Sequence, residues 1–109
     1  QTCALPISDA AALVRMVESL IAARLPHRLA EEDAARLVGT SRRTLVRRLA
    51  EAGCAFRPLL DRVLRERART MLAEGTQSRD EMATALGYTD ATSFSRACRR
   101  WFGAKGVRG

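Results

Sequence analysis

The chain has 109 residues, which is enough for one domain or two very small ones. It is 47% hydrophobic but only 5% aromatic, so its core must consist mainly of Ala, Leu and Val side chains, and no alternating run favours a β-strand. The formal net charge of +7 favours a polyanionic partner, although an arginine-rich solvated surface gives the same balance.

Composition also disfavours several classes of function. His27 is the single histidine, and no cluster of polar residues has catalytic spacing, so a histidine-based metal site or a Ser-His-Asp triad is implausible. The three cysteines, Cys3, Cys54 and Cys98, lack metal-ligand spacing and fit a reduced cytosolic compartment. No apolar run approaches the ~20 residues of a transmembrane helix. We therefore expect a cytoplasmic protein that is not an enzyme, with no metal, cofactor or membrane contact.

Residues 1–7 read Gln-Thr-Cys-Ala-Leu-Pro-Ile, which resembles the translation of a sequencing-adapter oligonucleotide. The alternative is a genuine disordered N-terminus, and in either case we leave these residues out of the fold. Apolar residues then recur at three- and four-residue spacing and predict a helix over residues 9–25. Ser8 is a suitable N-cap for this helix, and Pro26 ends it.

A short helix over residues 31–38 is predicted next, with acidic residues in its first turn and a poor N-cap at Ala30. Gly39 permits a tight turn, and Ser41 is positioned to cap a second helix over residues 42–52. This pattern predicts a helix-turn-helix. On the second helix, Leu45 and Leu49 form an apolar seam on one face, and Arg43 and Arg47 lie on the opposite face.

Residues 58–74 predict a long amphipathic helix that connects this unit to the next one. Pro58 fits its first turn, Gly75 closes it, and Phe56 anchors its entry. We interpret this helix as a rigid spacer with charged side chains on its outer face.

A second helix-turn-helix follows the spacer. Ser78 and Glu81 form a capping box, and the helix that they start ends at Gly87. We expect Thr89 to cap the last helix, over residues 90–102, with Asp90 in its first turn. The apolar seam predicted on this helix consists of Phe94, Cys98 and Trp101. The opposite, polar face consists of Thr92, Arg96 and Arg99.

The two units repeat one pattern. The first reads Gly39-x-Ser41 and then Leu45-x-Arg47; the second reads Gly87-x-Thr89 and then Phe94-x-Arg96, with one extra residue between turn and seam. Each places an arginine on the outer face, two residues beyond the first core anchor. We therefore expect an all-α fold with two homeodomain-like helix-turn-helix subdomains, residues 8–55 and 76–109, joined by a linker helix within residues 56–75.

Residues 29–103 resemble the DNA-binding domain of the AraC/XylS family of bacterial transcription regulators. The motifs that carry the resemblance are Thr40-Ser41-Arg42-Arg43-Thr44-Leu45-x-Arg47-Arg48-Leu49 and Leu86-Gly87-Tyr88-Thr89-Asp90, leading to Phe94-Ser95-Arg96-x-x-Arg99-Arg100-Trp101-Phe102-Gly103. The resemblance implies seven helices, two recognition helices in major-groove segments on one face of the DNA, and an upstream effector or dimerisation domain. RNA polymerase is a further expected partner. The chain departs from the family after Gly103, where the usual Pro and Tyr are missing, and at Cys98, where Phe is usual.

We hypothesise that Arg43, Arg47 and Arg96 reach base edges, because arginine pairs bidentately with guanine. Other arginines would neutralise phosphates, while hydroxyl groups and two helix N-termini add hydrogen bonds. The spacer would set the two units about one DNA turn apart, roughly 34 Å. The full candidate set for double-stranded DNA is Ser41, Arg42, Arg43, Thr44, Arg47, Arg48, Thr89, Thr92, Ser95, Arg96, Arg99 and Arg100.

Two other functions share part of this pattern. A non-specific nucleic-acid-binding protein would need the positive charge but not the paired turns. A helical protein-interaction module would use the Leu and Ala faces, and its binding would be nearly insensitive to salt.

Overall fold

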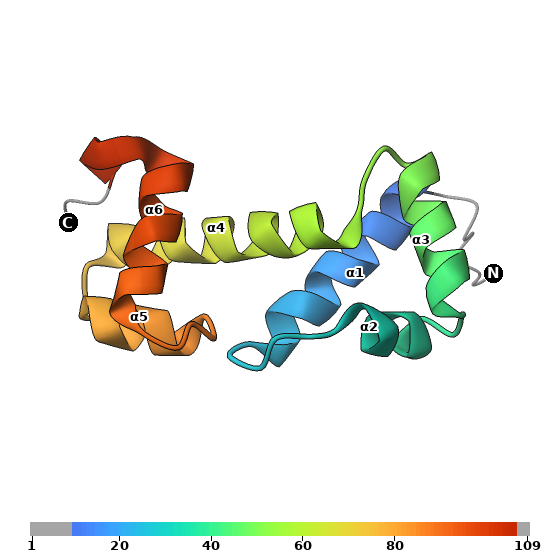
Figure 1. Ribbon diagram of the computed structural model, residues 1–109, viewed down its shortest axis with the longest axis horizontal. Coiled ribbons are helices and arrows are strands. Elements are labelled where there is room, and N and C mark those ends of the chain that lie inside the picture. The colour runs from blue at the N-terminus through green and yellow to red at the C-terminus, as the bar shows by residue number, and fades with distance from the viewer. Residues whose placement is uncertain (1–9, 107–109) are drawn as a thin grey trace. The chain divides into compact units, whose positions relative to one another are not determined.

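The computed structural model describes the backbone of residues 10–106 and the side chains of residues 10–103. Over this range the chain is all-helical, as predicted, and has no strand (Figure 1). The adapter-like residues and the Ser8 cap lie outside the described residues. The helices are α1 (Ala10–Arg24), α2 (Glu31–Leu37), α3 (Arg42–Glu51), α4 (Phe56–Glu74), α5 (Arg79–Ala85) and α6 (Ala91–Gly106).

The described chain divides into two compact units. The first holds α1 and the segment Leu29–Val63, which contains α2, α3 and the first part of α4. The second holds the remainder of α4 together with α5 and α6, and it also includes the short segment Leu25–Arg28. Each unit therefore contains one pair of helices joined by a tight turn, α2–α3 and α5–α6.

The core of the first unit is built mainly from aliphatic side chains of all its helices, with the ring of Phe56. Ala34 and Ala35 of α2 are buried, and their small size allows α1 and α3 to approach closely. The predicted seam of α3 is confirmed, since Leu45 and Leu49 are fully buried. Burial of a leucine side chain stabilises a fold by about 1.5–3 kcal/mol. The other buried side chains are Leu13, Val17, Ile21, Leu29, Phe56, Leu59 and Leu60.

The core of the second unit centres on Phe94 of α6, which is fully buried. The ring of Tyr88 lies against it, with ring centroids 5.8 Å apart. Cys98 is also fully buried, as the seam prediction requires, whereas Trp101 is half-buried and contacts Phe102 edge-on at 5.9 Å. The remaining buried side chains are Leu64, Ala68, Met82, Ala83, Leu86 and Ala97.

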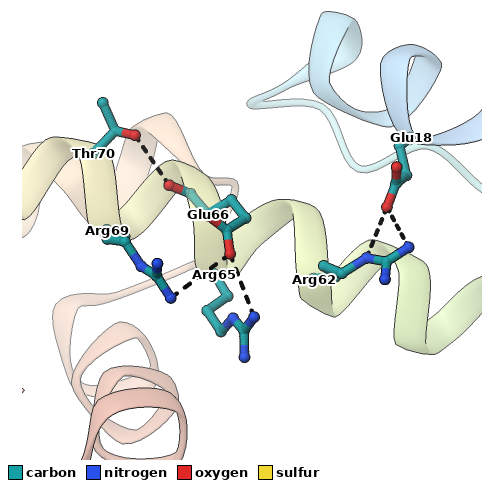
Figure 2. A network of polar contacts seen from close by, with 6 residues as sticks. All are labelled: Glu18, Arg62, Arg65, Glu66, Arg69 and Thr70. Atoms are coloured by element: carbon teal, nitrogen blue, oxygen red, sulfur yellow. Dashed lines mark hydrogen bonds and ion pairs between the residues drawn. The ribbon is translucent and has the colours of Figure 1, made fainter. Parts of the chain in front are cut away.

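The outer face of α4 carries ion pairs, shown in Figure 2. In the first unit, Arg62 contacts Glu18 of α1, with Nη2 at 2.6 Å and Nε at 2.7 Å from the carboxylate. In the second unit, Glu66 accepts from Arg65 at 3.3 Å and lies 3.7 Å from Arg69. Exposed pairs of this kind contribute little stability, about 0–1 kcal/mol each. The charged side chains of α4 therefore occupy its solvated face, as its amphipathic pattern predicts.

The turns within the two helix pairs, α2–α3 and α5–α6, close in the same way. The Thr40 N–H donates to the Ala35 carbonyl at 2.9 Å, and the Tyr88 N–H donates to the Ala83 carbonyl at 2.9 Å. Gly39 and Gly87, with φ of 82° and 83°, supply the left-handed residue that this helix ending requires. The predicted capping box of Ser78 and Glu81 is present at the start of α5.

The cap predicted for the last helix is wrong by one residue. α6 begins at Ala91, and its cap is Asp90, whose Oδ1 accepts the Ser93 N–H at 2.7 Å; Thr89 lies in the turn. The turn closure uses Gly87 and Tyr88, so the next residues compete for the cap. A carboxylate is the stronger acceptor and interacts favourably with the helix N-terminus.

The end of α6 contains a break at Gly103. Its φ of 78° and ψ of −179° lie outside the helical region, so the continuous helix ends at Phe102, where the sequence pattern places it. The backbone then takes one further short helical stretch to Gly106, at an angle to the rest (Figure 1). The side chains of the tail lie outside the described residues.

Candidate nucleic-acid interface

The outer face of α3 is exposed along its length. Arg43 and Arg47 lie one turn apart and point away from the buried leucine seam. Val46 is 44% exposed and lies on the same side of the helix, followed one turn later by exposed Ala50. This face therefore combines two guanidinium groups with a small apolar strip.

Two arginines of α3 form ion pairs with acidic residues. Arg42 Nε lies 3.2 Å from a carboxylate oxygen of Glu31 in α2. Arg47 Nη1 lies 3.2 Å from a carboxylate oxygen of Glu51, one turn later on α3. All these side chains remain partly solvated, so the pairs are weak and can exchange for phosphate or base contacts.

Hydroxyl groups at the start of α3 are engaged in the cap. Ser41 Oγ accepts the Thr44 N–H at 3.1 Å, which confirms the predicted N-cap, and it donates to Thr44 Oγ1 at 3.0 Å. Ser41 is exposed and Thr44 is half-buried. Arg48 is half-buried on the flank of α3, unlike the exposed arginines of the outer face.

The outer face of α6 is more polar and more basic. Thr92, Arg96, Arg99 and Arg100 are exposed, and the Arg100 guanidinium lies 5.5 Å from the centroid of the Trp101 ring. Ser95 is half-buried, and its hydroxyl accepts a hydrogen bond from Arg79 Nη1 of α5 at 3.0 Å. This hydrogen bond of the Ser95 hydroxyl therefore links α5 to α6.

The carboxylate at the start of α6 is held in its charged form. The backbone and side-chain hydrogen bonds from Ser93 lower the pKa of Asp90 below its ordinary value of 3.8, and nearby Arg96 lowers it further. An exposed anion therefore lies at the start of α6, six residues before the outer arginine Arg96. It stabilises the helix N-terminus and orients α6 at the turn.

With the cap of α6 corrected, the two recognition helices share one register. The first core anchor lies four residues after the cap in both, as Leu45 follows Ser41 and Phe94 follows Asp90. The outer arginines, Arg47 and Arg96, follow these caps by six residues. The extra residue noted in the sequence therefore lies in the turn, at Thr89, and not between the cap and the seam.

Two residues of this region were not predicted from the sequence. Val46 was missed because helical periodicity favours the seam and the charged positions, although its place between Arg43 and Arg47 was visible. Arg28 was missed because its partners are distant: its Nε donates to the Leu86 carbonyl at 2.9 Å, and its guanidinium lies 4.6 Å from the centre of the Tyr88 ring.

The described part of the chain offers neither a metal-binding cluster nor a membrane-spanning helix. Between residues 10 and 103 no three His, Cys, Asp or Glu side chains are grouped so that they could hold a metal ion. No helix in the described part is long and apolar enough to cross a bilayer.

Comparisons with known proteins place this geometry in a family. A family model described as a helix-turn-helix domain matches residues 34–105. The chain is 38% identical over 69 residues to the HTH-type transcriptional regulator VqsM of Pseudomonas aeruginosa, covering 63% of this chain and 21% of VqsM. It is 41% identical over 61 residues to the HTH-type transcriptional regulator VirS of Mycobacterium tuberculosis, covering 56% of this chain and 18% of VirS.

A solved structure agrees with these matches. The transcriptional regulator CdpR of Pseudomonas aeruginosa superposes with a TM-score of 0.74 at 35% identity, over 84% of this chain and 29% of CdpR. The matched region spans about a fifth of the curated relatives, so the comparison concerns their helix-turn-helix part. The match of the family model to residues 34–105, with the paired turns in the structure, shows that this chain belongs to the AraC-type helix-turn-helix family of transcriptional regulators, which implies that it binds DNA.

Proposed function

We propose that the chain binds specific sequences of double-stranded DNA by inserting α3 and α6 into two major-groove segments. The observation that carries this proposal is the shared register of the two helices. Each has a capped N-terminus after a tight turn, a buried anchor four residues later, and an exposed arginine six residues after the cap. A helix held in this way presents its outer face to a groove.

Within this proposal, Arg43, Arg47 and Arg96 read base edges, because they project from the outer faces and arginine recognises guanine O6 and N7 bidentately. Thr92 occupies the position in α6 that matches Arg43, and it contacts the DNA with a shorter side chain. The arginines at the helix margins hold the phosphates, which sets the register of the protein on the duplex. These are Arg42, Arg48, Arg99 and Arg100.

The helix N-terminus at Ser41 would offer backbone N–H groups to a phosphate. We assign Thr44, Thr89 and Ser95 to secondary contacts with the sugar-phosphate backbone of the DNA. Thr44 and Ser95 already use their hydroxyls in internal hydrogen bonds, and Thr89 lies in the turn before the cap.

The proposal can be tested by selecting bound sequences from a randomised duplex pool with the full 109-residue chain, at several salt concentrations. We expect an asymmetric site with two short blocks. Arg47→Ala should weaken binding to the selected site by about 1–3 kcal/mol and relax the preference at one base of one block, and Arg96→Ala should do the same in the other block. Arg67→Ala, which removes an exposed arginine of α4 outside the proposed interface, is the matched control for net charge.

The outcome also separates the alternative functions. If no sequence is enriched and binding falls steeply with salt, only a non-specific electrostatic attraction exists and the proposal fails. If Arg47→Ala weakens binding equally on all sequences, Arg47 is a phosphate contact. If duplex DNA does not bind at all, a protein-interaction module becomes the better interpretation.

The relatives that match this chain are longer, and they are named as transcriptional regulators. On this basis we propose that the whole protein regulates transcription in the bacterial cytoplasm, in association with the nucleoid. We further propose that it contacts RNA polymerase and carries an effector-binding or dimerisation domain upstream of the helix-turn-helix part. Measuring reporter output from a promoter that contains the selected site, with and without the whole protein, tests this role.

A further inference from the structure

The outer face of α3 carries an aliphatic side chain that the core does not use. Val46 is 44% exposed, although its neighbour Leu45 is fully buried. Valine is not favoured at a solvated helix position by intrinsic propensity. Ala50 lies one turn further along and is also exposed, so Val46 and Ala50 together form an apolar strip. Because Arg43 and Arg47 project from the same face, this strip lies where the DNA would be held.

The equivalent positions of α6 have a different chemistry. Counted from the caps, Val46 corresponds to Ser95, and Ala50 corresponds to Arg99. Ser95 is half-buried and its hydroxyl accepts from Arg79, and Arg99 is charged and exposed. The apolar strip is therefore a property of α3 alone, so it does not follow from the shared architecture of the two units.

We propose that Val46 packs against the C5-methyl group of a thymine in the major-groove segment that α3 reads, and so makes thymine the preferred base at that position. This inference rests on the proposed function and adds one specificity-determining residue to it. In the major groove, the thymine methyl is the one apolar group that a base pair presents to an aliphatic side chain. The guanidinium groups of Arg43 and Arg47, which flank the strip, attract the DNA polyanion. We therefore infer that DNA is what contacts the strip.

The experiment changes only the methyl group. Each thymine of the selected site is replaced in turn by deoxyuridine, which keeps the hydrogen-bonding edge and removes the methyl. Binding of the full chain is then measured by fluorescence anisotropy. One replacement in the α3 block should weaken binding about fourfold, the effect of uncovering one methyl-sized group.

Two variants complete the test. With Val46→Ala, the thymine and deoxyuridine forms should bind equally at that position, at about the weaker affinity. Because Val46 is exposed and alanine favours helices, α3 should still fold. Leu37→Ala is the matched control: Leu37 is 46% exposed but lies at the end of α2, and its removal should leave the thymine preference unchanged.

The results separate the two proposals. A pool that yields no preferred sequence contradicts the proposed function itself. A selected site at which no thymine replacement in the α3 block matters, or a block that contains no thymine, overturns the role of Val46 while leaving the proposed function intact. The same conclusion follows if the methyl effect survives in Val46→Ala or is lost in Leu37→Ala, since the contact then belongs to another side chain.

Discussion

Arg28 and Leu86 are 58 residues apart in the sequence and are joined by a hydrogen bond of 2.9 Å from the Arg28 Nε to the Leu86 carbonyl. This bond lies at the turn between α5 and α6, within the second unit. Gly87 directly follows Leu86, and a Cβ atom at Gly87 would collide with the Pro26 carbonyl oxygen and crowd the Arg28 side chain. The second turn is therefore restricted to glycine by packing as well as by its positive φ.

This difference between the turns predicts unequal effects of one substitution. Gly39→Ala places a side chain at φ 82° in open space, so it should cost about 1–2 kcal/mol for the left-handed backbone. Gly87→Ala meets the same strain at φ 83° and adds the collision with a backbone carbonyl, so it should cost more. Amide hydrogen exchange in α3 and in α5 measures the two effects separately. Equal loss of protection would mean that Pro26 and Arg28 move aside freely.

The two turns also show how far local sequence signals extend. Gly39 and Ser41 gave the correct turn and cap, because a left-handed residue and a capping hydroxyl act within a few residues. At the second turn, Thr89 and Asp90 are both good caps and stand side by side, so the pattern did not distinguish them. The structure resolves the choice through the closure at Tyr88 and the bond between Asp90 and Ser93.

Helical periodicity correctly predicted that Leu45, Leu49, Phe94 and Cys98 are buried and that the arginines opposite them are exposed, because the period depends only on helix geometry. Trp101, which the same pattern assigned to the seam of α6, is only half-buried. Periodicity did not predict the partners of the outward residues. Arg42 pairs with Glu31, and Ser95 accepts from Arg79, and in each pair the partner comes from the preceding helix. Such contacts depend on how two helices are packed. Arg28 gave no local signal, since its partner lies beyond four intervening helices.

The corrected cap predicts a dependence of stability on pH. The folded state lowers the pKa of Asp90 below 3.8, so the charged carboxylate contributes stability that is fully present above the unfolded pKa and is lost as the pH falls through the folded pKa. Asp90→Asn keeps a capping oxygen without the charge. The stability difference between wild type and this variant should therefore be largest at neutral pH and should shrink as the pH falls below 3.8.

Urea unfolding followed by the fluorescence of Trp101, the single tryptophan, measures this difference in the helix that carries the cap. Thr89→Ala is the control, because Thr89 is exposed and does not cap α6. If Thr89→Ala destabilises the protein more than Asp90→Ala does, the assignment of the cap to Asp90 is wrong.

The buried thiol of α6 should be unreactive in the folded protein. Burial raises the pKa of Cys98, so the thiol stays protonated at neutral pH, and the reactive thiolate is scarce. Cys54 is half-buried. In a Cys3→Ser variant, a maleimide should modify Cys54 quickly and Cys98 only when the second unit unfolds in denaturant. Mass spectrometry of the modified peptides follows both rates, and equal rates in native buffer would show that α6 opens readily.

Removing one acidic residue should strengthen DNA binding. Glu51 holds Arg47 in an exposed ion pair of 3.2 Å and places a negative charge at the margin of the proposed interface. Exposed pairs are worth about 0.2–1 kcal/mol, so Glu51→Gln should tighten binding about 1.4- to fivefold at low salt, and the gain should shrink as salt screens the charges. Anisotropy titrations on the selected duplex measure the gain.

A matched variant separates release of Arg47 from a general change in net charge. Glu66→Gln removes the same charge from α4, where Glu66 contacts Arg65 and Arg69 outside the proposed interface (Figure 2). We expect it to change the affinity much less than Glu51→Gln does. In an Arg47→Ala background the gain from Glu51→Gln should fall to the level of Glu66→Gln, because no paired arginine is left to release. A full gain in that background would mean that Glu51 acts by repelling phosphate directly and does not compete with DNA for the Arg47 side chain.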